Sequence, residues 1–174
     1  MRHPRPQVAD GICYGRSDLP LAEEAATCAA RLRPLLPEGA PVFSSPLARC
    51  RHLAEALHPA PIFDERLREA DFGHWEMQPW DAIDRAALDA WAADPLHYAG
   101  HGGESVAQLQ ARAVECARAI AACHEEAVLV VHAGIMKVLA GALAGIPAPE
   151  WFGFSFAYGT TSLIEDGRLV WQNR

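Results

Sequence analysis

Two candidate anion-binding sites occur where a predicted strand passes into a predicted helix. The apolar run 41–44 leads to Arg49 in the first turn of the next helix, and the run 127–131 ends at His132, two residues before Gly134. A side chain in a first turn leans back toward the helix N-terminus, where the helix dipole also attracts anions. The glycine lets a ligand approach the backbone closely. Since ligands of open α/β sheets bind at the carboxyl ends of strands, these residues are expected at one shared site.

Three further residues could complete a site for phosphoryl transfer. Arg2 and His3 stand at the start of the chain, and Glu69 lies in the mixed segment 62–73. A neutral histidine is a nucleophile near pH 7, an arginine has planar donors for phosphate, and a carboxylic acid can exchange a proton with an alcohol. Each candidate also has a simpler interpretation as a frayed terminus, a surface side chain or a structural histidine. Only their combination favours a phosphate site.

Other chemistries for phosphate and metals are excluded by pattern. No cysteine is followed six positions later by arginine, and the chain contains neither D-x-D, G-x-x-x-x-G-K-[ST] nor H-E-x-x-H. His97 and His101 have the i, i+4 spacing of a helical metal site, but glycines flank His101 and favour a loop. No metal and no cofactor are therefore expected.

Alternating helical and strand-like segments must position these residues. Strands are expected at 41–44 and 127–131, and an antiparallel hairpin at 161–171 that turns at Asp166-Gly167. Helices are expected at 21–36, from Ser45 as N-cap to about 57, and at 80–92, 105–123 and 134–144. This order predicts a three-layer α/β/α fold with a mostly parallel central sheet and an antiparallel edge near the C-terminus. Residues 1–174 are expected to form a single domain.

Composition limits the partners and the location. The chain has 174 residues, 51% of them hydrophobic, and no apolar run of the length that a membrane helix needs. The N-terminus has no secretory pattern, and five cysteines without a C-x-x-C pair indicate a reducing cytoplasm. A net charge of −7 and no basic stripe speak against nucleic acid, so an anionic substrate would need a local cationic pocket. Of the 15 basic residues, only Lys137 is a lysine.

Five short motifs, in order along the chain, resemble those of the histidine phosphatase (phosphoglycerate mutase-like) superfamily. They are Arg2-His3, Ser45-Pro46-Leu47-x-Arg49, Leu67-x-Glu69-x-x-Phe72-Gly73-x-Trp75-Glu76, Gly103-Glu104-Ser105 and Val131-His132-Ala133-Gly134. The Phe-Gly-x-Trp-Glu string and the short chain are most similar to the α-ribazole phosphatase branch. The resemblance implies a phosphoglycerate mutase-like fold.

The resemblance also implies a role for each matching residue. His3 would be the nucleophile that becomes phosphohistidine, while Arg2, Arg49 and His132 would bind the phosphoryl oxygens and stabilise their charge. Glu69 would protonate the leaving alcohol and then deprotonate the attacking water. No metal is then required for hydrolysis.

The implied substrate is a small phosphorylated metabolite, and the branch suggests α-ribazole 5′-phosphate of cobalamin synthesis. Two alternatives stay open: phosphoryl transfer as in phosphoglycerate mutase, and a catalytically impaired protein that binds a phosphorylated ligand. Membrane and nucleic acid are not expected as partners. The protein could be a monomer or a homodimer.

Several positions depart from the family pattern. Pro4 follows His3 and has no N–H to donate, so we expect Arg5 to compensate as a cation at the rim of the pocket. Arg16 and Glu104 are further candidate substrate contacts, and a solvated surface position is an equal alternative for Arg5 and Arg16. In the family a strand normally precedes the Arg-His pair, whereas this sequence begins with the pair. Either the start is assigned too late or most of that strand is missing, and in the second case the nucleophile is expected to fray with the terminus.

Residues 74–105 are expected to form a small cap that determines specificity. This segment contains Trp75, Trp80, Trp91 and the histidines at 97 and 101. Each tryptophan could equally be an ordinary core residue.

Overall fold

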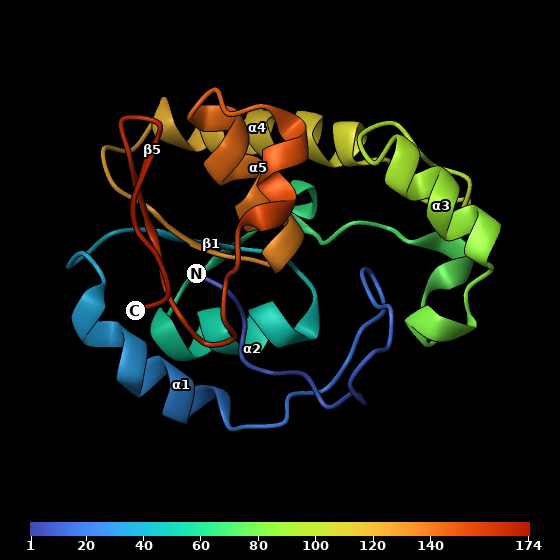
Figure 1. Ribbon diagram of the computed structural model, residues 1–174. Coiled ribbons are helices and arrows are strands. Elements are labelled where there is room, and N and C mark those ends of the chain that lie inside the picture. The colour runs from blue at the N-terminus through green and yellow to red at the C-terminus, as the bar shows by residue number, and fades with distance from the viewer.

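A parallel sheet of three strands lies at the centre of the computed structural model, which describes residues 1–174 (Figure 1). The strands are β1 (Val42–Ser44), β2 (Ile62–Phe63) and β3 (Val128–Val130), in the order β2-β1-β3. The outer strands both pair with β1 in parallel. β-branched residues on β3 suit a strand that is covered on both faces. The predicted parallel sheet is confirmed.

The first three residues extend this sheet beside β3. Arg2 forms a parallel bridge with Val131. The amide of His3 donates to the carbonyl of Val131 at 3.1 Å, and the amide of Val131 donates to the carbonyl of Met1 at 3.0 Å. These bonds attach His3 to the strand that ends at His132 and so oppose the predicted fraying of the terminus.

Helices cover both faces of the sheet and form the predicted three layers (Figure 1). On one face lie α1 (Ala25–Leu32) and α2 (Ala48–Leu57), and on the other α4 (Val106–Ala121) and α5 (Ala133–Leu143). Each pair of helices packs against the strands and forms a separate hydrophobic cluster with them. The remaining helix, α3 (Arg85–Ala93), lies to one side of the layers.

Helix ends differ from the sequence predictions for local reasons. α1 begins at Ala25 instead of residue 21, and it passes at Arg33–Leu35 into a 3₁₀ turn that contains a proline. Ser45 is not the N-cap of α2, since Leu47 occupies that position. The predicted helix 80–92 is split into a 3₁₀ turn and α3, which Asp84 caps. Further 3₁₀ turns are Glu65–Leu67, Gly73–Trp75 and Ala148–Gly153.

The C-terminal hairpin forms as predicted. β4 (Leu163–Glu165) pairs antiparallel with β5 (Arg168–Trp171), and both residues of the Asp166-Gly167 turn have positive φ. The hairpin is a small sheet of its own and not an edge of the parallel sheet. No helix has the length and apolar character needed to cross a bilayer.

Candidate active site

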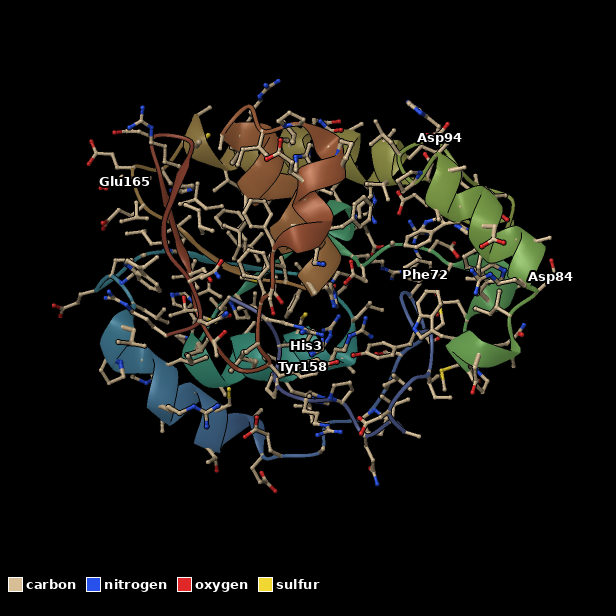
Figure 2. All side chains as sticks on the ribbon, viewed as in Figure 1. His3, Phe72, Asp84, Asp94, Tyr158 and Glu165 are labelled. Carbon is tan, nitrogen blue, oxygen red and sulfur yellow. The ribbon has the colours of Figure 1, made fainter.

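His3 lies buried at the centre of the molecule, between α2 and the start of α5 (Figure 2). Its Nδ1 donates to the carbonyl of Pro4 at 2.6 Å, so Nε2 carries the free lone pair. Burial and the charge of Arg49 hold the pKa of His3 well below its usual value of 6.5. The ring is therefore a neutral imidazole whose nucleophilic nitrogen is defined by a backbone contact. Pro4, which cannot donate, contributes here as an acceptor.

His132 and Arg49 meet beside His3, as the strand-to-helix junctions predicted. The Nε of Arg49 donates to Nδ1 of His132 at 3.2 Å, so Nε2 of His132 carries the hydrogen and donates to Ser45 Oγ at 2.8 Å. The His3 and His132 rings lie 5.1 Å apart, centre to centre. Burial and Arg49 also hold the pKa of His132 well below 6.5. Ser45 Oγ also accepts a bond from the amide of Leu47, the N-cap residue of α2, at 3.3 Å, so Ser45 contacts both the histidine and the start of the helix.

Arg2 brings a second cation to the same place. Its Nη1 donates to the carbonyl of Phe156 at 2.7 Å, and its guanidinium lies 3.5 Å from the centre of the Tyr158 ring. Its Nε is buried without a hydrogen-bond partner. Arg2 and Arg49 therefore surround His3 with positive charge in a poorly hydrated region, where electrostatic stabilisation of an anion is strong.

Glu69 is fixed against the first turn of α5. Its Oε2 accepts a bond from the amide of Gly134 at 3.0 Å. Arg112 on α4 holds the backbone that carries Glu69, because its guanidinium donates to the carbonyls of Arg66, Arg68 and Glu69. The same guanidinium binds both carboxylate oxygens of Glu104 at 2.7 Å. The carboxylate of Glu69 is thus placed by residues of two helices.

Replacing Gly134 with alanine is expected to lower kcat/KM by about 10- to 100-fold without lowering the melting temperature. A Cβ at this position would overlap Oε1 of Glu69 and displace the carboxylate, whereas alanine suits a helix better than glycine. Steady-state kinetics and thermal unfolding measure the two effects. Gly153→Ala is the matched control, since nothing lies near its added methyl group. Unchanged kinetics in Gly134→Ala would contradict the placement of Glu69.

A cavity of about 330 Å³ opens beside these groups. Arg2, His3, Glu69 and Gly134 line it together with Glu104, while Arg49 and His132 are completely buried behind. The remaining wall is largely aromatic and includes Phe72, Trp91, Tyr98, Trp151 and Phe152. The cavity can hold an apolar or flat group attached to a phosphate near His3.

Arg5 and Arg16 do not line this cavity. The Arg5 side chain is exposed and pairs with Asp10 at 2.6 Å, five residues further along the chain, so the structure does not support the expected rim contact. Arg16 pairs with Asp71 at 3.5 Å and with Glu104 at 3.7 Å. Of the three candidate substrate contacts, only Glu104 reaches the cavity.

Tyr14, Tyr158 and Lys137 are among the cavity residues that lie outside the set predicted from the sequence. The hydroxyl groups of Tyr14 and Tyr158 meet at 2.5 Å, and the Tyr158 ring lies 5.6 Å from that of His3 (Figure 2). Lys137 lines the cavity one helical turn after Gly134 and donates to the carbonyl of Phe152 at 3.1 Å. Burial and Arg2 lower the pKa of Lys137. The sequence singled out Lys137 in one way only, as the single lysine of the chain.

The segment 74–105 contributes both core and cavity. Trp75 is buried with Cys13 and Ile83, away from the cavity. His97 pairs with Asp94 at 3.0 Å, while His101 packs against the Trp75 ring at 4.9 Å. The i, i+4 histidine pair therefore does not form a common site.

The buried histidines predict an acid-sensitive fold. Below pH 6.5 the unfolded chain protonates its histidines, whereas His3 and His132 stay neutral in the folded protein because their pKa values are lowered. The unfolded state then binds more protons, so the free energy of unfolding decreases as pH falls, by about 1.4 kcal/mol per pH unit for each histidine. Urea denaturation at several pH values measures how the free energy of unfolding changes with pH. In His3→Asn this change per pH unit should be smaller than in the wild type by the contribution of one histidine. Equal slopes would contradict the lowered pKa of His3.

Comparison with known proteins adds four findings. The family described as histidine phosphatase superfamily (branch 1) matches residues 1–172. The adenosylcobalamin/alpha-ribazole phosphatase of Escherichia coli (strain K12) is 30% identical over 179 residues, covering 95% of this chain and 87% of that protein. The alpha-ribazole phosphatase structure from Shigella flexneri has a TM-score of 0.83 at 26% identity, covering 100% of this chain and 94% of that one. A mycobacterial glucosyl-3-phosphoglycerate phosphatase has a TM-score of 0.77 at 27% identity, covering 92% and 84%.

Proposed function

The chain belongs to the histidine phosphatase superfamily, branch 1, and from this premise we propose that it hydrolyses phosphomonoesters through a phosphohistidine at His3. The observation that carries the proposal is the bond from Nδ1 of His3 to the Pro4 carbonyl, which leaves Nε2 free as a nucleophile. Arg2 and Glu69 line the same cavity as His3, and the charge of Arg49 acts on the His3 ring, so the other groups that the reaction needs are close by.

The reaction has two half-reactions at one phosphorus atom. In the first, Nε2 of His3 attacks phosphorus, the bond from phosphorus to the ester oxygen breaks, and Glu69 gives its proton to the leaving alcohol. In the second, Glu69 takes a proton from water, whose oxygen attacks phosphorus and releases His3 and inorganic phosphate. Arg2 and Arg49 stabilise the charge on the phosphoryl oxygens in both transition states, with His132 Nε2–H as a further donor once it turns from Ser45.

We propose α-ribazole 5′-phosphate as a substrate to test first. The aromatic wall of the cavity is suited to a flat heteroaromatic ring, and two relatives carry α-ribazole phosphatase in their names. The mycobacterial relative carries a different substrate in its name, so the fold alone does not determine the alcohol. Residues 74–105 would act as the cap that selects it, through Trp91, Tyr98 and His101.

Hydrolysis of p-nitrophenyl phosphate in the presence of EDTA tests the activity. Turnover that EDTA does not reduce supports the metal-independent route, and turnover that requires an added metal contradicts it. A panel that compares α-ribazole 5′-phosphate with sugar phosphates and 3-phosphoglycerate then tests the substrate. Conversion of 3-phosphoglycerate to 2-phosphoglycerate would indicate a mutase, and binding of phosphate without any turnover would indicate an impaired binder.

A further inference from the structure

Glu76 accepts five hydrogen bonds and yet does not line the cavity. Its Oε1 accepts from the amides of Arg16 at 2.8 Å and Phe72 at 3.1 Å. Its Oε2 accepts from the amides of Gly15 at 3.1 Å and Ser17 at 2.9 Å, and also from the Ser17 hydroxyl. Three successive amides of segment 15–17 therefore converge on one carboxylate, an arrangement suited to an anion.

The carbonyls of the same segment bind Arg49. Nη2 of Arg49 donates to the carbonyl of Gly15 at 2.5 Å, and Nη1 donates to that of Ser17 at 2.7 Å. The third nitrogen, Nε, donates to His132. Segment 15–17 thus has the carboxylate of Glu76 on its amides and the guanidinium of Arg49 on its carbonyls.

The packing around segment 15–17 leaves it little freedom. A Cβ on Gly15 would overlap the carbonyl of Ala70, the carboxylate of Glu76 and the ring of Phe72. Burial raises the pKa of the Glu76 carboxyl. The hydrogen bonds from Ser17, Gly15 and Phe72 lower this pKa by more, so it lies below its ordinary value. A half-buried carboxylate that accepts several amide bonds stays ionised and holds its donors in a fixed geometry.

We propose that Glu76 is a positioning residue that orients Arg49 toward the phosphoryl group through the backbone of residues 15–17. The inference deepens the proposed function, because it takes Arg49 to be a phosphoryl-binding group. Glu76 touches no substrate atom. It fixes the amides of Gly15 and Ser17, and the carbonyls of the same residues direct the guanidinium.

The inference predicts a specific kinetic loss in Glu76→Gln. Glutamine keeps the shape but replaces one acceptor oxygen with an NH₂ group that faces amide donors, so segment 15–17 should shift. Misplacement of Arg49 is expected to lower kcat/KM for p-nitrophenyl phosphate by about 10- to 100-fold and to raise the inhibition constant of inorganic phosphate. Asp64→Asn is the matched control, since Asp64 also accepts a backbone bond but contacts neither segment 15–17 nor Arg49.

A double-mutant cycle with Arg49→Ala separates positioning from a merely structural role. If Glu76 acts through Arg49, adding Glu76→Gln to Arg49→Ala should change kcat/KM by less than about twofold. Independent effects that multiply would overturn the inference. The same cycle can be measured without turnover, from the rise in melting temperature that inorganic phosphate causes in each variant. A wild-type protein that hydrolyses no phosphomonoester would refute the proposed function, whereas an active wild type with multiplicative effects refutes the inference alone.

Discussion

Replacing His3 with alanine is expected to lower kcat/KM for p-nitrophenyl phosphate by at least about 10⁴-fold, the largest effect of any single substitution in this protein. The variant loses the proposed nucleophile, and the neighbouring neutral imidazole of His132 has both ring nitrogens engaged, by Arg49 and by Ser45. Water could attack the ester directly, but it would lack the fixed position that Nε2 of His3 gains from its bond to Pro4.

The covalent step gives this prediction a second measurement. Wild-type protein that is quenched during turnover of ³²P-labelled substrate should carry an acid-labile label, and His3→Ala should carry none. His52→Ala is the control, because His52 is exposed on α2 and does not line the cavity. Label that persists in His3→Ala, or turnover that survives the change, would contradict the assignment of His3.

The sequence could predict those site residues that follow the end of a strand. Parallel strands place their carboxyl ends at one edge of a sheet, and this rule alone brings Arg49 and His132 together. No strand was predicted directly before His3 or Glu69, so these two residues were assigned through ordered motifs. The structure brings all four residues to one place.

Contacts between distant segments were not predictable in the same way. The hydroxyl groups of Tyr14 and Tyr158 meet although 144 positions separate them, and Glu76 binds a segment about 60 positions away. Neither pair has a periodicity or a spacing that marks it, because tertiary packing alone creates the contact. The pairing of Arg5 was unpredictable for a related reason. A nearby carboxylate, Asp10, was available on the surface, and the carbonyl of Pro4 already contributed to the site.

Replacing Glu69 with glutamine should slow the enzyme in a manner that depends on the leaving group. An alkyl phosphate needs a proton on its ester oxygen as the bond breaks, so kcat/KM for an alkyl ester is expected to fall by about 10²- to 10⁴-fold. The p-nitrophenolate anion leaves without that proton, so phosphorylation of His3 by p-nitrophenyl phosphate should be much less affected. The second half-reaction still lacks its general base with either substrate.

Glu69→Gln should therefore convert p-nitrophenyl phosphate turnover into a burst. Rapid mixing is expected to release about one equivalent of p-nitrophenol per enzyme, followed by a slow steady state in which phosphohistidine accumulates. Glu65→Gln, an exposed carboxylate four residues earlier that pairs with Arg68, should behave as wild type. Equal losses of kcat/KM for aryl and alkyl esters without a burst would assign Glu69 to binding instead. Because its carboxylate accepts the amide of Gly134 in the wall of the cavity, only the leaving-group dependence distinguishes a proton donor from a group that merely shapes the pocket.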